Sequence, residues 1–317
     1  MSRDLSPGLA AGAAGGRSAA APRTVRRRRS RDLGTAALFL LPSLLGLLAF
    51  LVLPLFASFV LSFTNWQVMG TTRFVGVANY VRLATVDPVF WHVLGVTLMF
   101  TAEYLALNIV VSLTMAVWIT SLSWGQRLFR LVFFLPTFTP LVGIALVWLL
   151  MLTPGGVVDW GMHALGIPLP NLITQPGLAL QVVVIVSLWS HFGYNMLLFG
   201  AALEAIPSTY LDAASIDGAD TWRRFWRIKL PLISPALFFG TVLTAITSLQ
   251  TFDQVYALTR GGPGSATTTL GYAIYAQGFV SYKLGYASSI AWVLFAIIMA
   301  LTLFQLRLQR QWVNYDA

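Results

Sequence analysis

Six long apolar runs constrain the fold of this chain more than any other feature. A helix needs about 20 predominantly apolar residues to cross a bilayer core of about 30 Å. The runs are long enough to do so, and they cover Ala36–Phe63, His92–Thr120, Phe129–Leu152, Leu178–Leu203, Ala236–Leu258 and Ser288–Leu306. We therefore expect an all-α polytopic membrane protein with six transmembrane helices.

Prolines and a carboxylate refine this expectation. Pro42 and Pro54 predict bends in the first run, because proline removes a helical hydrogen bond. Pro136 and Pro140 stand near the start of the third run and predict a broken entry to that span. The second run follows Asp87-Pro88, and the Asp87 side chain is able to cap its helix.

The composition agrees with a membrane protein and excludes several other classes. Hydrophobic residues make up 57% of the chain and charged residues 10%, whereas charged residues are about a quarter of a soluble domain. The chain has no cysteine, and its three histidines are scattered without metal-ligand spacing. We expect no metal site. The formal charge of +9 sits mostly in the first 32 residues and in short loops, which indicates membrane topology and a lipid partner rather than a nucleic acid.

The basic residues predict how the helices are oriented. Of the 20 Lys and Arg, sixteen lie on one side: eight in the N-terminal tail, then Arg127, Arg130, Arg223, Arg224, Arg227, Lys229, Arg307 and Arg310. The other side has only Arg73, Arg82, Arg260 and Lys283. Because cytoplasmic loops carry the excess of Lys and Arg, we expect both termini to be cytoplasmic.

This orientation assigns the residues outside the apolar runs to tails and loops. Residues 1–32 are rich in Ala, Gly, Ser and Arg, which predicts a disordered basic cytoplasmic tail. The apolar run after it is too long for a signal peptide, and no clear A-x-A site follows. We assign residues 33–66 to the first span, 67–90 to an external loop and 309–317 to a cytoplasmic C-terminal tail.

One cytoplasmic loop, Leu203–Leu237, concentrates charge in an otherwise apolar chain. The pattern predicts a short helix over Tyr210–Ile216, a break at Gly218 and a second helix over Trp222–Lys229 that Leu230-Pro231 stops. Asp220 or Thr221 is placed to cap the second helix. By composition alone, this helix–turn–helix is an amphipathic anchor in the lipid headgroups.

The residue order is more specific than that. The segment Leu211-Asp-Ala-Ala-Ser-Ile-Asp-Gly-Ala219, followed by Ile228-Lys-Leu-Pro231, resembles the EAA motif of importer permeases of the ATP-binding cassette (ABC) class. The resemblance implies that this loop is a coupling helix that docks on an ATPase subunit. The residues it implies for that contact are Asp212, Ala213, Ala214, Asp217, Gly218, Ala219, Trp222, Arg223 and Phe225. Asp212 stands where the family usually has Glu, so its pairing with a basic residue of the ATPase stays open.

The resemblance extends from about Leu33 to the C-terminus. Phe74–Tyr80, Asp87–Trp91, Leu258–Pro263, Tyr272–Tyr286 and Trp312–Tyr315 resemble the MalF/UgpA-type permeases for oligosaccharides and glycerol phosphate. This implies a permease core over residues 91–308, with the coupling loop at 204–235, in a bacterial cytoplasmic membrane. The implied partners are a second related permease, two ATP-binding subunits and an extracytoplasmic solute-binding protein.

The chain itself lacks an ATPase motif. A phosphate-binding loop places a lysine after glycine, but Lys229 follows Ile228 and Lys283 follows Tyr282. We therefore expect no catalytic residues and no cofactor on this chain, with ATP and Mg bound by the partner subunits. The alternative class is an exporter or secondary transporter that needs no solute-binding protein. The coupling loop favours the importer permease.

Ionisable residues inside the runs are costly and often functional. Glu103 and His191 lie at similar depths in the second and fourth runs, which permits a pair between them. The simpler interpretation is that each is hydrogen-bonded separately at a helix interface.

A second polar and aromatic group lies in the fourth and fifth runs. It consists of Trp189, Tyr194, Asn195, Gln250, Phe252, Asp253 and Tyr256. Aromatic faces stack on sugar rings and polar groups bind hydroxyls, so we expect these residues to line a pathway for a hydroxyl-rich solute. An aromatic belt with helix-packing polar residues is the alternative. The spans offer no basic residue for a phosphate, which favours an oligosaccharide over a polyol phosphate, although the sequence does not identify the solute.

Overall fold

The computed structural model describes residues 38–67, 70–167 and 170–312. In those ranges the chain is helical apart from turns, extended segments and one isolated bridge between Thr64 and Phe74. The expected N-terminal tail, residues 1–32, and the end of the C-terminal tail lie outside the described residues. The chain divides into two units, Met1–Phe56 and Ala57–Ala317.

The described part of the first unit is helical from Leu38 onward. It contains the π-helical turn η1 (Leu48–Val52) and the start of α2 (Leu53–Ser62). The π turn ends two residues before Pro54, which has no N–H to donate to a regular helix. Its large apolar side chains are mostly exposed, as expected for a helix whose solvent is lipid.

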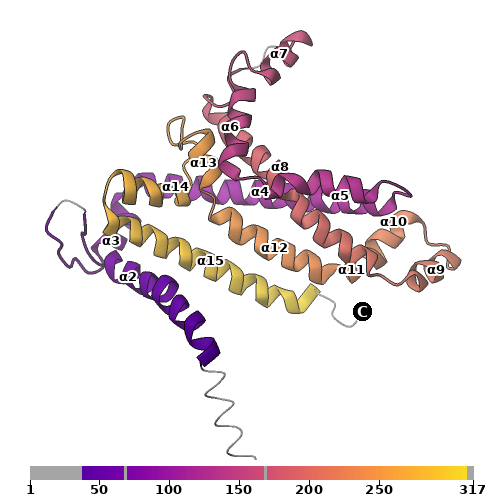
Figure 1. The fold of residues 1–317 in the computed structure, drawn as a ribbon, viewed down its shortest axis with the longest axis horizontal. Helices are drawn as coiled ribbons and strands as arrows, with labels where there is room; N and C mark the ends of the chain where they lie inside the picture. Colours follow the sequence, from indigo (N-terminus) through magenta and orange to yellow (C-terminus); the bar gives the residue numbers. More distant parts are fainter. Residues whose placement is uncertain (1–37, 68–69, 168–169, 313–317) are drawn as a thin grey trace, which may run out of the picture. The chain divides into compact units, whose positions relative to one another are not determined.

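The second unit contains the remaining helices (Figure 1). In chain order they are α3 (Ala78–Val81), η2 (Arg82–Val86), α4 (Pro88–Ser121), α5 (Gln126–Phe134), η3 (Leu135–Phe138), α6 (Leu141–Leu152), α7 (Val157–Ala164), α8 (Pro176–Glu204), α9 (Ser208–Ile216), α10 (Thr221–Arg224), η4 (Phe225–Lys229), α11 (Leu230–Leu232), α12 (Ser234–Leu249), α13 (Asp253–Leu258), α14 (Leu270–Tyr275), η5 (Ala276–Val280) and α15 (Leu284–Trp312).

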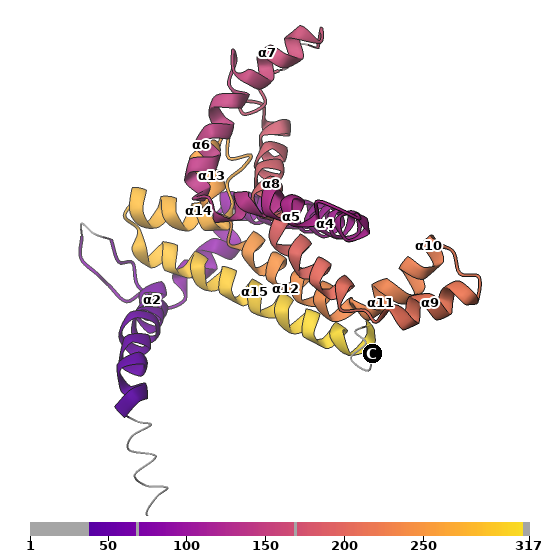
Figure 2. The same ribbon diagram turned by 45° about the vertical axis from the view of Figure 1, so that its right-hand side comes forward.

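Helices α4 and α8 form the centre of this unit and pack against each other along their length (Figures 1 and 2). Three buried apolar clusters surround them, and the largest joins α4 and α8 to α6 and α13. The start of α4 is set locally, because the Asp87 carboxylate accepts hydrogen bonds from the N–H groups of Val89 and Phe90. The predicted cap is thereby confirmed.

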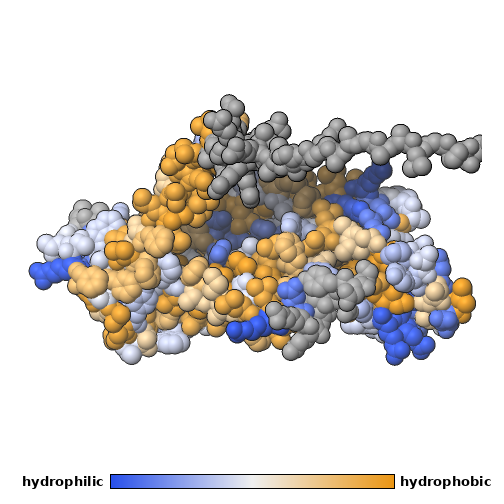
Figure 3. Space-filling model, turned by 90° about the horizontal axis from the view of Figure 1, so that it is seen from below, coloured by the Kyte–Doolittle hydropathy of each residue, from blue (hydrophilic) through white to orange (hydrophobic). Residues whose placement is uncertain are grey.

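Five helical segments are long and apolar enough to cross a membrane: Leu38–Ser62, Pro88–Ser121, Leu141–Ala164, Pro176–Glu204 and Leu284–Gln309. A sixth candidate is the pair Thr221–Leu232 and Ser234–Leu249, which is bent by 68°. Figure 3 shows hydrophobic residues over much of one face, with strongly hydrophilic residues gathered at the end that carries α9 and α10 and in smaller patches elsewhere. The expectation of an all-α membrane protein with six transmembrane helices is confirmed for the described residues, where the sixth span is the bent pair.

Two of the expected spans are interrupted. The third run is broken at Pro136 and Pro140 into α5, η3 and α6, as predicted. The fifth run was expected to be one helix, and this is wrong: α12 ends at Leu249 and α13 begins at Asp253.

Tertiary contacts explain the break in the fifth run. The Thr251 carbonyl accepts a hydrogen bond from the Thr269 hydroxyl at 2.7 Å. A Cβ added to Gly271 would lie 2.6 Å from the same oxygen, so only glycine permits the approach of α14. These contacts replace the helical hydrogen bonds that the break gives up.

Candidate functional site

A cavity of about 580 Å³ lies among α4, α8, α12 and the break between α12 and α13. Most of its walls come from residues far apart in sequence that the bundle brings together. The lining residues are Phe100, Tyr104, Asn108, Thr137, Leu141, Ser187, His191, Tyr194, Asn195, Leu243, Thr244, Thr247, Ser248, Gln250, Thr251, Phe252, Asp253 and Gln254. The lining therefore combines aromatic rings, hydroxyls and amides with one carboxylate.

A buried hydrogen-bond network joins three helices at this cavity. The Asn195 amide on α8 donates to the Asn108 side-chain oxygen on α4 at 2.6 Å and to the Thr244 hydroxyl on α12 at 2.8 Å. Asn108 in turn donates to the Tyr104 hydroxyl at 3.3 Å. Because each residue is buried, the network fixes the relative positions of the three helices.

One atom of this network is unused. The Asn195 side-chain oxygen is buried and has no hydrogen-bond partner among the described residues. An unpaired buried acceptor costs free energy, about 1–3 kcal/mol. Asn195 lines the cavity, but this oxygen is shielded from solvent and a Cβ added to Gly240 would lie 3.0 Å from it, so it lies against α12.

The structure brings together five of the seven residues expected on the solute pathway. Tyr194, Asn195, Gln250, Phe252 and Asp253 all line the cavity. The other two expected residues, Trp189 and Tyr256, lie outside its lining. The ring of Trp189 packs on Trp148 with ring centroids 5.8 Å apart.

Tyr256 belongs instead to an aromatic cluster beside the cavity. Its ring centroid lies 5.4 Å from that of Phe252 and 5.3 Å from that of Tyr275. Phe252 also stacks on Tyr272 at 6.4 Å. A hydrogen bond with Tyr256 raises the pKa of the Tyr275 hydroxyl above its ordinary value. The cluster therefore holds Phe252 at the edge of the cavity.

Sequence reasoning missed Tyr104, Asn108 and Thr244. A signal for them exists: Tyr104, Asn108 and Ser112 recur every four residues on α4, and Thr244 and Ser248 do so on α12. Residues with that spacing share one helical face. Polar stripes of this kind inside apolar runs indicate a polar interior interface.

Glu103 and His191 do not meet. In the described ranges, no hydrogen bond or ion pair joins them. The His191 ring nitrogen lies 3.2 Å from the Ser187 carbonyl of its own helix. His191 lines the cavity and Glu103 does not. The simpler interpretation, in which each residue has its own surroundings, therefore holds for His191.

The second candidate site is the charged loop, which folds as a helix–turn–helix. Gly218 ends α9 with φ of 75°, and the Ala219 N–H donates to the Ala214 carbonyl at 2.9 Å. This is the glycine-terminated helix end that the sequence predicts. The Asp220 carboxylate caps α10 by accepting from the Arg223 N–H at 2.7 Å, so the predicted cap is confirmed.

Most of the residues expected to contact an ATPase face outward. Asp212, Ala213, Asp217, Gly218, Trp222 and Arg223 are exposed, Ala219 and Phe225 are half-buried, and Ala214 is buried. Ile216, which was not predicted for the contact, is 87% exposed. The loop therefore exposes both charged and large apolar side chains.

The predicted end of the second loop helix is wrong. Leu230-Pro231 does not stop it, because the helix runs through η4 and α11 to Leu232 before the chain bends by 68° into α12. A π-helical turn over Phe225–Lys229 precedes Pro231. Such a turn shifts the hydrogen-bond register, and this accommodates a residue that has no N–H.

The chain matches one protein-family model and many curated proteins. Residues 108–314 match the model described as "Binding-protein-dependent transport system inner membrane component". The "Probable ABC transporter permease protein YesP" of Bacillus subtilis is 34% identical over 88% of this chain and 91% of that protein. The sn-glycerol-3-phosphate transport system permease protein UgpA of Yersinia pestis is 34% identical over 78% of this chain and 83% of its own length. The multiple sugar-binding transport system permease protein MsmF of Streptococcus mutans is 32% identical over 86% of this chain and 94% of its length.

Solved structures share the fold. A chain of a bacterial alginate ABC transporter, solved in complex with an alginate pentasaccharide-bound periplasmic protein, aligns with a TM-score of 0.80 at 21% identity, over 90% of this chain and 97% of that one. A chain of the MetNI methionine ABC transporter aligns with a TM-score of 0.52 at 18% identity, over 73% of this chain and all of that one.

Proposed function

Because this chain belongs to the family of binding-protein-dependent transport system inner membrane components, we propose that it forms half of the transmembrane pathway of an ATP-driven importer. The observation that carries this proposal is the cavity at the centre of the second unit, whose walls combine aromatic rings, hydroxyls and amides with the Asp253 carboxylate. A second, related permease completes the pathway as a heterodimer. A solute-binding protein delivers the solute on the extracytoplasmic side.

The solute is a neutral, hydroxyl-rich molecule of the sugar type. Hydroxyls, amides and aromatic rings line the cavity, and no Lys or Arg is among the described residues that line it. A phosphate would meet the Asp253 carboxylate there with no compensating cation from this chain. The relatives include permeases named for sugars and for glycerol phosphate, and the lining favours the sugars.

Energy comes from two ATP-binding subunits, which carry the ATP and Mg. The loop of α9, α10, η4 and α11 docks on one of them, with Asp212, Asp217 and Arg223 at the contact and with Trp222 and Phe225 as apolar anchors. The exposure of its charged side chains and of Ile216 supports a protein contact. Alternating access then follows when closure of the ATPase pair moves the two coupling loops together.

Both termini and this loop lie on the cytoplasmic side. The bias of sixteen basic residues to four supports this orientation. Since the chain has no cysteine, single cysteines placed at Gly218 and Gly262 report their side by labelling with an impermeant maleimide. Labelling of the Gly218→Cys variant from outside intact cells would exclude an importer with this topology.

The proposal as a whole is tested through the solute. The solute-binding protein of the same complex is purified, and the ligand that it retains is identified by mass spectrometry. Uptake of that ligand, labelled isotopically, is then measured in cells with and without this chain. We expect a sugar or oligosaccharide whose uptake requires the chain. An uptake that persists without it would contradict the proposed function.

A further inference from the structure

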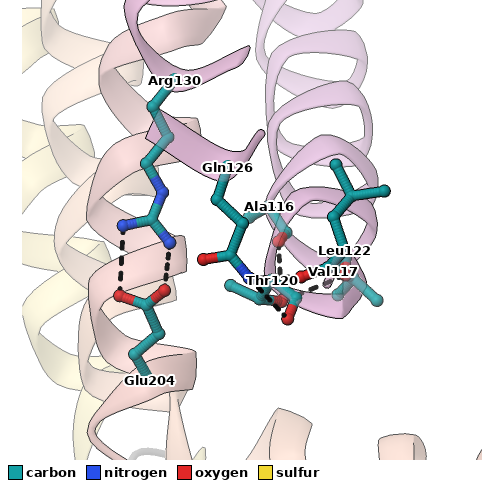
Figure 4. Close-up of polar contacts among 7 residues, drawn as sticks. All are labelled: Ala116, Val117, Thr120, Leu122, Gln126, Arg130 and Glu204. Carbon is teal, nitrogen blue, oxygen red and sulfur yellow. Dashed lines mark hydrogen bonds and ion pairs between the residues drawn. The ribbon is translucent and has the colours of Figure 1, made fainter. Parts of the chain in front are cut away.

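An ion pair fastens the short helix α5 to the end of α8. The Arg130 guanidinium on α5 donates to both oxygens of the Glu204 carboxylate, the last residue of α8 (Figure 4). One contact joins Nη1 of Arg130 to Oε2 of Glu204, and the other, which is shorter, joins Nη2 to Oε1. A bidentate pair of this kind fixes orientation as well as distance, because the guanidinium is planar.

Two further contacts tie the same segment to α8 at deeper levels. Gly193 on α8 lies against the backbone of Phe133 and Phe134 so closely that a Cβ would meet the Phe133 carbonyl and lie 2.9 Å from the Phe134 Cα. One turn deeper, the Thr137 hydroxyl donates to the Ser190 carbonyl at 3.2 Å. From Arg130 to Thr137, the α5–η3 segment is therefore clamped to α8 at three successive points.

The start of α5 is held as well. The Gln126 side chain donates to the Leu122 carbonyl at 2.7 Å and to the Thr120 carbonyl at 3.4 Å, at the end of α4 (Figure 4). Thr120 lies in the last turn of α4 and Leu122 directly follows the helix, where carbonyls lack the helical N–H partners of the interior. The short turn between α4 and α5 is therefore closed by a side chain.

The clamped segment has one end at the loop and the other at the cavity. Glu204 is separated from α9 by only Ala205, Ile206 and Pro207. At the opposite end, Thr137 and Leu141 line the cavity. Pro136 and Pro140 interrupt the helix there, and helix kinks commonly occur at proline.

We propose that α5 and the end of α8 act as one lever, locked by the Arg130–Glu204 pair, through which the coupling loop moves the Thr137–Leu141 wall of the cavity. This inference rests on the proposed function, because docking on an ATPase is what gives the loop a motion to transmit. Neither Arg130 nor Glu204 lines the cavity, and both act as positioning residues that set how the loop and the cavity wall move together.

The neighbouring contacts explain why the ion pair is the lock. The Gly193 contact resists closer approach but not sliding, and a single hydroxyl bond at Thr137 fixes one point only. The ion pair sets the axial register of α5 on α8 at the place where α8 leaves the bundle. Its side chains are 29% and 43% exposed, so its contribution to folding is small and its removal leaves the bundle intact.

The test uses the assembled complex and a cysteine reporter, and it needs no identified solute. A Leu141→Cys substitution in this cysteine-free chain places the reporter on the cavity wall. Its rate of maleimide labelling is measured in membranes before and after the ATPase is trapped with MgATP and orthovanadate. The same samples give the amount of trapped ADP, which reports the ATPase subunits independently of the lever.

The variants are Arg130→Gln, Glu204→Gln, and the swap Arg130→Glu with Glu204→Arg. Arg127→Gln is the matched control, because Arg127 is exposed on the same helix and makes no ion pair within the described residues. We expect each single Gln variant to reduce the vanadate-induced change in labelling about threefold. A factor of this size corresponds to the free energy of one partly exposed ion pair. The swap variant restores the vanadate-induced change in labelling, and Arg127→Gln leaves that change unaltered. The amount of trapped ADP is the same in all of these variants.

Each other outcome overturns the inference in a recognisable way. Equal labelling changes in the Gln variants and the parent show that the pair does not lock the lever. A swap no better than the single variants excludes direct pairing. Should a Gln variant fail to assemble, the swap decides alone, because it retains both charges. A parent reporter that does not respond although ADP is trapped shows that the wall does not move with the ATPase, and the lever fails; absence of trapped ADP in the parent contradicts the proposed function itself.

Discussion

The coupling loop and the cavity are held in place by opposite kinds of contact. In the loop, the fixing hydrogen bonds are local: Asp220 bonds the Arg223 N–H three residues away, and Arg224 bonds Ser215 nine residues away. In the cavity, Asn195 bonds Asn108 across 87 residues and Thr244 across 49. The loop is therefore a self-contained surface, whereas the cavity exists only when α4, α8 and α12 are assembled.

This difference predicts how the two regions respond to substitution. A change on the loop surface alters binding to a partner and leaves the bundle folded. A change in the helices around the cavity alters the solute site, the packing or both. The predictions below separate these outcomes, beginning with the largest expected effect.

Removing the carboxylate of the cavity has the largest expected effect on transport. A charge-assisted hydrogen bond to a solute hydroxyl contributes about 1.5–3 kcal/mol, so Asp253→Ala shifts the concentration dependence of uptake about tenfold or more. Asp253→Asn retains a polar partner and has a smaller effect. The measurement is uptake of the identified solute in cells with an otherwise intact complex. Unchanged uptake with an unchanged concentration dependence in both variants would remove Asp253 from the site.

Crowding the contact between α5 and α8 comes next. Gly193→Ala puts a methyl group against the backbone of Phe133 and Phe134, and overpacking of this kind costs about 1–3 kcal/mol. Gly200→Ala on the same helix is the control, because its Cβ meets open space. Thermal unfolding of the detergent-solubilised protein, followed by tryptophan fluorescence, distinguishes the two. Equal melting temperatures would show that the α5–α8 approach is not tight.

A backbone change in the loop should spare the bundle. Gly218 has φ of 75°, and a residue with a Cβ pays about 1–2 kcal/mol in this conformation. Gly218→Val should therefore distort the loop and reduce recovery of the ATPase subunit in purified complexes. Gly218→Asn is the matched variant, since Asn tolerates the left-handed region better than valine does. A loss of ATPase subunit as large in Gly218→Asn as in Gly218→Val would argue against a backbone cause.

The smallest expected effect belongs to a single surface charge. Asp212 is exposed, and an exposed ion pair contributes about 0.2–1 kcal/mol. Asp212→Asn should weaken ATPase binding slightly, with a stronger effect at low salt than at high salt. Asp212→Glu, which has the longer side chain usual in the resembling family, should retain or strengthen it. A titration of ATPase subunit onto immobilised permease checks both, and a salt-independent difference would exclude an ion pair.

The sequence predicted the parts of the fold that depend on local chemistry. The apolar runs, the Asp87 and Asp220 caps, the Gly218 turn and the break at Pro136 and Pro140 all follow from residues close together in the chain. The comparison with known permeases agrees with the fold that these features indicate.

Features that depend on remote contacts were missed or predicted wrongly. The break after Leu249 is set by Thr269 and Gly271 on another helix, and nothing in the run itself signals it. The helix passes Pro231 because a π turn adjusts its register. In the site, Asn108 and Thr244 are indicated only by their helical spacing, and their roles appear when Asn195 reaches both.

The central claim is that the charged loop couples ATP hydrolysis to transport. It is tested most directly by combining Asp212→Lys with Gly218→Val in a complex reconstituted in liposomes. The measurements are ATP hydrolysis stimulated by the loaded solute-binding protein and uptake of the solute that it carries. We predict that stimulated hydrolysis and uptake are both lost while the chain remains inserted and folded. Survival of both activities would contradict the account and leave the loop as a membrane anchor.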